Sequence, residues 1–145
     1  MANTEHYRRL EKMMQSANFA NLVANYASIK EGEAEITLPV SEEYFHAAGA
    51  MHGAFYFLAL DNAAFFAANS LVEDVFLLTS SFTTYITRPV SEGTLKALGK
   101  VVNRTKSQII AEAVMYNEEG KEIARGSGVF VRSRKPFSEI EGYTS

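Results

Sequence analysis

The sequence predicts an α+β domain in which a curved antiparallel sheet wraps around one long central helix, with an extra helix at the N-terminus. Two observations support this class. Residues 54–68 are apolar except for Asp61 and Asn62, which is typical of a helix covered on most faces by other structure. The second half of the chain divides into segments with strand character separated by turn residues, as expected for an antiparallel sheet.

The N-terminal part is expected to contribute one amphipathic helix and one strand. Thr4 can open a helix over residues 5–17. Its apolar side chains recur at i, i+3, i+4 and i+7 and form one stripe: Leu10, Met13, Met14 and Ala17. Residues 26–38 then alternate between polar and apolar side chains, which predicts a half-buried strand ended by Pro39.

The remaining elements are the central helix and four strands. Residues 41–51 are expected to be a loop, and residues 53–70 the helix. The strands are expected at four further ranges: 76–87, 93–104, 107–117 and 121–132. Their connections are short and consist of turn residues, so we expect successive strands to pair as antiparallel hairpins. Such a meander can curve around a single apolar helix.

Length and composition limit the function further. A chain of 145 residues predicts a single domain over 1–145, with its core at about 26–132. The net charge of −3 argues against nucleic-acid binding. The absence of cysteine excludes disulfides, thiolate metal sites and a cysteine nucleophile. Because the N-terminus lacks a signal-peptide core and the apolar run is too short to cross a bilayer, we expect a cytoplasmic protein that does not bind membranes.

Asp61 is the strongest candidate for chemistry. Burying an ionised carboxylate without partners costs roughly several kcal/mol, so such groups are paired, hydrogen-bonded or used in a reaction. The alternative is a structural role, in which Asp61 caps a neighbouring element or accepts backbone N–H bonds. The segment just before the helix favours the reactive role.

This segment, residues 46–54, predicts a site for a developing negative charge. Gly53 lets the backbone approach a ligand closely, and the first N–H groups of the helix are free donors at its positive end. Asp61 lies about two turns further along, roughly 12 Å at 1.5 Å per residue. One chain is therefore not expected to bring the acid and the donor turn together, whereas a two-fold dimer can.

These motifs resemble the hotdog-fold acyl-CoA thioesterases of the phenylacetate-pathway type, in the 4-hydroxybenzoyl-CoA thioesterase superfamily. The matching residues are His52-Gly53, Leu60-Asp61-Asn62 and residues 120–126, and the resemblance covers roughly residues 30–131. It implies hydrolysis of an acyl-CoA without a cofactor, by a homodimer or dimer of dimers with its active site at the subunit interface. It also implies that Asp61 acts as general base or nucleophile and that the Gly53 amide polarises the thioester carbonyl.

Two positions depart from the family pattern, which is an Asn followed six residues later by a His-Gly-Gly turn. His46 stands in place of the Asn, and Ala54 in place of the second Gly. An imidazole can donate a hydrogen bond as a carboxamide does, but it titrates near neutral pH and differs in reach. His46, His52 and Ala54 are expected to surround the substrate, with His52 holding the turn through hydrogen bonds rather than acting as a base.

Further substrate contacts are expected around Asp61. The resemblance implies that Thr79 or Ser80 contacts the attacking water or the carboxylate, and the alternative is a strand-edge hydroxyl satisfied by backbone or solvent. Three apolar side chains lie nearest to Asp61 by helical spacing and are expected to line an acyl channel: Phe57, Leu58 and Phe65.

Basic residues in the second half of the chain suit the phosphates of coenzyme A. Three of them are spaced by four and are expected on one face of a strand: Lys96, Lys100 and Arg104. Together with Lys106 they form a basic stripe near a turn. Phosphates favour such residues, and the resemblance assigns Arg104 to this contact. The alternative is an ordinary solvated strand face.

The sequence therefore predicts an acyl-CoA thioesterase and leaves two alternatives open. One is a non-catalytic hotdog domain that binds acyl-CoA or another small ligand. The other is a hydratase or dehydratase of the same fold, although the proline-rich loop of that branch is missing. No metal is expected at His46, His52 and Asp61, because no further ligands cluster with them. The acyl group and its carrier are not assigned.

Overall fold

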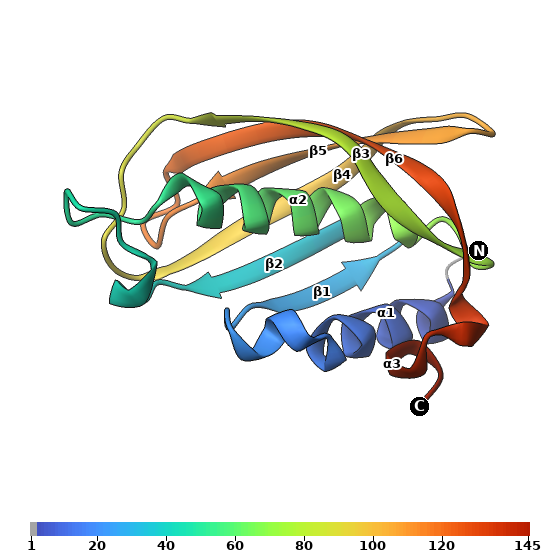
Figure 1. Ribbon diagram of the computed structural model, residues 1–145. Helices are drawn as coiled ribbons and strands as arrows, with labels where there is room; N and C mark the ends of the chain where they lie inside the picture. The colour runs from blue at the N-terminus through green and yellow to red at the C-terminus, as the bar shows by residue number, and fades with distance from the viewer. Residues whose placement is uncertain (1–2) are drawn as a thin grey trace.

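A computed structural model describes residues 3–145, which form one antiparallel sheet curved around a central helix (Figure 1). The helix is α2 (Gly53–Asn69). The six strands are β1 (Tyr26–Lys30), β2 (Glu33–Pro39), β3 (Val75–Ile86), β4 (Thr94–Arg104), β5 (Gln108–Tyr116) and β6 (Glu122–Pro136). Their order across the sheet is β1-β2-β4-β5-β6-β3. The predicted arrangement of a curved antiparallel sheet around one helix is confirmed.

Shorter helices flank this core. They are α1 (Thr4–Ser16), α3 (Glu141–Thr144) and the 3-10 helices η1 (Asn18–Asn21), η2 (Glu42–Tyr44) and η3 (Phe137–Glu139). The cap of α1 is Asn3 rather than Thr4, because its side chain accepts a hydrogen bond from the His6 N–H at 3.1 Å. The two C-terminal helices η3 and α3 were not predicted.

The segment 26–38 forms a hairpin of two strands, so the prediction of a single strand was wrong. Lys30 pairs with Glu33 across a two-residue turn. Gly32 has a φ of 71° in this turn, a conformation that glycine adopts at little cost. The alternation of polar and apolar residues is interrupted at residues 30–33, Lys-Glu-Gly-Glu, so the sequence does carry a local signal for this turn. Pro39 is the last residue of β2.

The predicted hairpin between β3 and β4 is also wrong. β3 pairs with β6, while β4 lies between β2 and β5. The connecting segment 87–93 therefore crosses from one side of the sheet to the other at the N-terminal end of α2. Two hydrogen bonds fix it there, from the Tyr56 hydroxyl to the Arg88 carbonyl at 2.9 Å and from the Met51 N–H to the Val90 carbonyl at 2.8 Å. The hairpins β4–β5 and β5–β6 are confirmed.

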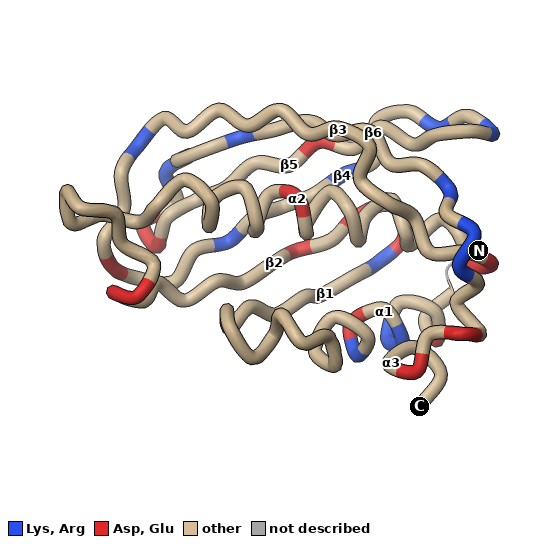
Figure 2. Tube along the Cα trace, in the orientation of Figure 1, with Lys and Arg blue, Asp and Glu red and all other residues tan. Residues whose placement is uncertain are grey.

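Helix α2 is covered on its inner face and open along one outer stripe. Small residues bring it close to the sheet, and a Cβ on Gly99 would collide with the Ala63 carbonyl oxygen. Figure 2 shows a single acidic segment on α2 and no basic one. Beyond its first turn, the side chains of α2 that are not fully buried lie along one stripe: Phe57, Leu58, Asp61, Asn62 and Phe65. The helix thus leaves exposed the surface that carries its only carboxylate.

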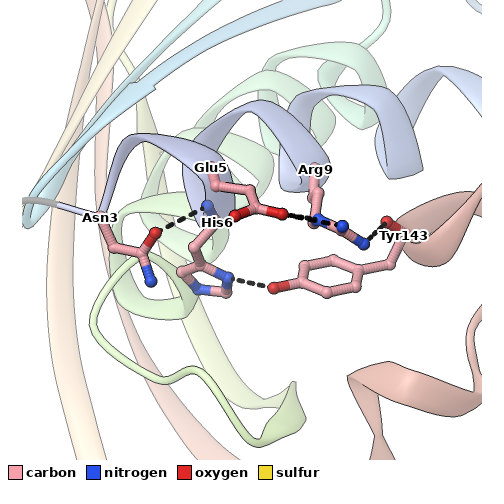
Figure 3. A network of polar contacts seen from close by, with 5 residues as sticks. All are labelled: Asn3, Glu5, His6, Arg9 and Tyr143. Atoms are coloured by element: carbon pink, nitrogen blue, oxygen red, sulfur yellow. Dashed lines mark hydrogen bonds and ion pairs between the residues drawn. The ribbon is translucent and has the colours of Figure 1, made fainter.

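A buried histidine joins both ends of the chain to α2. The His6 ring contacts the Tyr143 hydroxyl at 2.7 Å and the Asn69 carbonyl at 2.8 Å. Arg9 pairs with Glu5 at 2.8 Å and donates to the Tyr143 carbonyl at 3.2 Å (Figure 3). This network holds α1 and α3 against the C-terminal end of the central helix.

Candidate active site

Asp61 is half-buried on α2 and is held by a side chain from β3. The Thr79 hydroxyl donates a hydrogen bond to Asp61 Oδ1 at 2.9 Å. Burial raises the pKa of Asp61 above its usual range, and the hydrogen bond from Thr79 offsets part of that rise. A carboxylate with a raised pKa in a partly desolvated site is suited to take up a proton near neutral pH.

Ser80 lies at an irregularity of β3 beside this contact. The register with β6 shifts between Thr79 and Ser81, so Ser80 is the extra residue of a β-bulge and is exposed. Bulges redirect neighbouring side chains, and this one separates the two hydroxyls that the sequence could not tell apart. Thr79 faces Asp61, whereas Ser80 is the exposed bulge residue.

The N-terminus of α2 presents a free donor. The His52 side chain caps the helix by accepting a hydrogen bond from the Ala54 N–H at 3.0 Å. Within residues 3–145, the Gly53 N–H has no hydrogen-bond acceptor. It therefore remains available at the positive end of a helix of 17 residues. A Cβ added to Gly53 would lie 3.1 Å from Ile86 Cδ1, so a larger residue at this position would crowd the Ile86 side chain.

Asp61 and Gly53 do not meet within one chain. They are eight residues apart on one straight helix, which separates them by roughly 12 Å. Both lie toward β3, since Asp61 contacts Thr79 and Gly53 lies beside Ile86. A small reacting group cannot contact both residues of one chain at once, so a complete site needs Asp61 or Gly53 from a second copy of the chain.

His46 is oriented by its own loop. Its Nδ1 accepts a hydrogen bond from the Ala48 N–H at 3.0 Å, and the side chain is exposed. The loop is closed by a bridge between Phe45 and Met51, and Gly49 turns it with a φ of 85°. The imidazole is therefore engaged within its loop, at the end of the molecule where α2 begins.

A large apolar cavity of about 590 Å³ lies beside the open stripe of α2. Two of the three residues expected to line an acyl channel, Leu58 and Phe65, line this cavity. Phe57 does not, because it packs edge to face against Phe82 of β3 with ring centroids 5.7 Å apart. The opposite wall comes from the N-terminal segment, including Phe19. The sequence did not indicate that α1 lines a cavity, because its apolar stripe is explained equally well by packing against the rest of the domain.

A second cavity of about 450 Å³ carries the basic residues Arg104, Lys106 and Arg132. The predicted common face of Lys96, Lys100 and Arg104 is wrong. A β-bulge at Val102 shifts the register of β4 and reverses its alternation. Arg104 consequently lies on the helix side of the sheet, where its guanidinium donates to the Leu71 carbonyl at 2.9 Å.

Arg132 of β6 also lines this basic cavity and forms an ion pair with Asp74. Its position in β6 beside β5 could not be read before the strand order was known. Across residues 3–145, no three His, Asp or Glu side chains are grouped as metal ligands. In the same part of the chain, no helix is both long and apolar enough to cross a membrane.

Known proteins share this fold. A family model described as thioesterase superfamily matches residues 48–124. A protein of Sulfurisphaera tokodaii, provisionally named an esterase, is 25% identical over 79% of this chain and 85% of its own. The PaaI protein of E. coli, from the phenylacetic acid degradation operon, has a TM-score of 0.81 at 22% identity and covers 92% of this chain and 96% of its own. A thioesterase of Haemophilus influenzae has a TM-score of 0.75 at 18% identity, with coverages of 83% and 85%. The hotdog fold is thereby confirmed, and the matches support a thioester hydrolase at the level of the family.

Proposed function

This chain belongs to the thioesterase superfamily, and we propose that it hydrolyses acyl-CoA thioesters with Asp61 and the Gly53 amide as its catalytic groups. The thioester carbonyl oxygen accepts a hydrogen bond from the Gly53 N–H, which stabilises the negative charge that develops there. Asp61 either takes a proton from the attacking water or attacks the carbonyl carbon itself. In the first case the carbon–sulfur bond breaks after the hydroxide has added, and Asp61 gives the proton it took to the departing thiolate. In the second case the thiolate leaves an acyl–Asp61 anhydride and takes a proton from solvent, and water then hydrolyses the anhydride to release the acid.

The observation that carries this proposal is the state of Asp61. It is the sole acid on an apolar helix, burial raises its pKa, and Thr79 orients it toward β3. A purely structural carboxylate in this place would be expected to have a positive partner or several backbone donors. The free Gly53 N–H at the start of the same helix supplies the second group that thioester hydrolysis requires.

The active site is proposed to form between two protomers that join along β3. The two edges of the sheet differ. At the β1 edge, Ile29 receives two side chains of α1: Glu11 accepts from its N–H at 2.7 Å, and Arg8 donates to its carbonyl at 2.6 Å. β3 has 12 residues, pairs only with β6 and exposes Leu78 and Tyr85. Antiparallel pairing of two β3 edges generates a two-fold axis.

The basic cavity at the other end of α2 is proposed to hold the phosphates of coenzyme A. Arg104 and Lys106 lie there with Arg132, past the C-terminal end of the helix that carries Asp61. Arginine and lysine are the residues that bind phosphate groups best. His46, His52, Ala54 and Ser80 remain proposed contacts of the substrate around the helix start.

Hydrolysis of a panel of acyl-CoAs, followed by the appearance of free thiol, tests this function. Wild type is expected to release thiol from at least one substrate, and Asp61→Asn to lower kcat by roughly 10²- to 10⁴-fold. Tight binding of acyl-CoA without thiol release would instead favour a binding domain without catalysis. Hydration of an enoyl-CoA would favour the hydratase.

Gly53→Pro isolates the amide donor. Proline is tolerated at the first position of a helix and lacks the N–H, so the helix is expected to form without its donor. We expect a loss of about 10²- to 10³-fold in kcat. Gly53→Ala is the matched control, because it keeps the N–H and adds only the Cβ that meets Ile86. Equal losses in the two variants would mean that crowding, not the donor, is responsible.

Mixed dimers decide whether the site is shared. When equal amounts of inactive Asp61→Asn and Gly53→Pro chains exchange subunits, half of the dimers are mixed, and one of the two sites in each mixed dimer has both groups intact. About one quarter of the wild-type activity is therefore expected to return. If the two groups of one chain act together, mixing restores nothing.

A further inference from the structure

The apolar cavity beside α2 is walled by residues from both ends of the chain, which pack against each other. Met13, Met14 and Phe19 come from α1 and η1, and Ile140 follows η3. Among the described residues that form the wall, Lys135 is the only charged one. The network around His6 and Tyr143 holds α1 and α3 together beside the cavity, so its walls are braced at one end (Figure 3).

The cavity reaches Asp61 from two directions. On α2, Leu58 precedes Asp61 by three positions and Phe65 follows it by four, and residues with these spacings are neighbours on a helix surface. On β3, Phe76 lines the cavity and lies three residues before Thr79, the partner of Asp61. Asp61 itself does not line the cavity, but its neighbours on the helix surface do, so the carboxylate lies next to the cavity wall.

The apolar surface continues to the start of the helix. A shallower hollow of about 400 Å³ is lined by Ala54 and Leu22 and shares Phe19 and Leu58 with the larger cavity. From Leu58 to Phe66 alone, the larger cavity follows α2 for roughly 12 Å. Such a length suits a medium-chain or aryl-alkyl group, and it is far more than an acetyl group can fill.

We propose that this groove binds the acyl group of the substrate, and that the N-terminal segment 13–20 determines which acyl groups fit. The inference rests on the proposed thioesterase function and goes beyond it by naming the substrate class and the specificity element. A chain lying along the groove would leave its carbonyl carbon beside Asp61. Each methylene buried on these walls is expected to improve kcat/KM by about fourfold until the groove is full.

Ala17→Phe tests this proposal. Ala17 lines the groove, is exposed, and has an extended backbone with φ −69° and ψ 146°, so a larger side chain is accommodated without strain. The variant should lower kcat/KM at least tenfold for octanoyl- and phenylacetyl-CoA and leave butyryl-CoA within about twofold. Ala24→Phe, at an exposed alanine that lies just beyond this segment and does not line the groove, is the matched control and should behave as wild type.

A binding measurement keeps the groove and the reaction apart. Binding of octyl-CoA, a thioether that cannot be hydrolysed, is measured by calorimetric titration into the protein and compared with binding of coenzyme A itself. Wild type should bind octyl-CoA more tightly than coenzyme A, and Ala17→Phe should lose this difference. If wild type releases no thiol but keeps this pattern, the thioesterase function fails while the groove stands. If Ala17→Phe changes neither kinetics nor binding, the groove does not hold the acyl group.

Discussion

The charged form of Asp61 lowers the stability of the folded protein. Burial disfavours the carboxylate, and the single hydrogen bond from Thr79 does not remove the resulting rise in its pKa. Residues of this kind are kept where they react, and their replacement by a neutral relative often stabilises the protein while abolishing activity. The same property that makes Asp61 a suitable base therefore makes it a source of instability.

The stability of Asp61→Asn should depend on pH in a defined direction. Between 3.8, the ordinary pKa of this carboxyl, and its raised value, the folded protein binds a proton that the unfolded chain has lost. The contribution of Asp61 is thus present at low pH and is lost as pH rises through the raised pKa. We expect Asp61→Asn to melt above wild type at pH 7 and the difference to vanish near pH 3.

Asp74 provides a control of the opposite sign for this experiment. The hydrogen bond from Arg132 lowers the pKa of Asp74, so its contribution is present at neutral pH and disappears as pH falls through the lowered value. Asp74→Asn should therefore melt slightly below wild type at pH 7. The effect should be small, because the pair is exposed and screened by solvent. An Asp61→Asn variant that also melts lower would contradict the assigned cost.

Thr79 is predicted to position Asp61 and to tune it. Thr79→Val removes the hydrogen bond that lowers the Asp61 pKa, so that pKa should rise further. The acidic limb of the kcat/KM profile is then expected to move to higher pH, with kcat reduced by about tenfold. Thr79→Ser keeps the hydroxyl and should restore the profile. A merely structural role would lower stability in Thr79→Val without moving the limb.

At the scale of elements, small residues at the contact between α2 and the sheet determine the distance between them. Ala63 of the helix lies over Gly99 of β4, with room for no side chain between them. Across the sheet, the Phe82 ring of β3 lies over Gly126 and Gly128 of β6, where a Cβ on either glycine would collide with it. These contacts explain why glycine occupies these strand positions. The close approach at Gly99 also determines how deeply Asp61 of α2 is buried.

Gly99→Ala should disturb this approach directly. The new methyl group would meet the helix backbone, which cannot rotate away as a side chain can, so the free energy of unfolding should fall by about 1–3 kcal/mol or more. Leu98→Ala, at the exposed neighbouring position on the outer face, should cost less than about 1 kcal/mol. Urea unfolding of both variants measures this difference. Equal effects would show that the helix has space to move.

At the scale of the whole molecule, the two edges of the sheet have different roles. α1 satisfies the backbone of β1, and β1 is only five residues long. β3 is long and open, and it carries Thr79 near its middle and Ile86 at its end beside Gly53. The proposed interface along β3 would therefore cover a strand edge and bring together the two groups that we propose to be catalytic.

If the protein dimerises along β3 as proposed, charges placed on this strand are predicted to separate the protomers. Leu78→Lys combined with Tyr85→Lys adds two lysines to the open edge, which proteins use to prevent such pairing. Sedimentation should show monomers, and activity should be lost in parallel. Tyr26→Lys, an exposed tyrosine on β1, is the control and should leave a fully active dimer. Wild type that sediments as a monomer with full activity would rule out a shared site.

The sequence by itself determined what depends on neighbours along the chain. The apolar period marked α2 within one residue of its observed end, and Asp61 stood out because no other charge interrupts that run. The expectations that His52 holds the turn through hydrogen bonds and that the Gly53 N–H is a free donor followed from residue types beside a helix start. Each of these is a local property, which periodicity and turn chemistry report directly.

Only the tertiary structure decided which distant segments meet. The pairing of β3 with β6, the bulge that turns Arg104 to the helix side, and the wall that α1 adds to the groove were all absent from local patterns. A short turn-rich connection is compatible with a hairpin or with a crossing between strands. The choice between them is made by the apolar surface of α2, which is buried only when strands from both halves of the chain close around it.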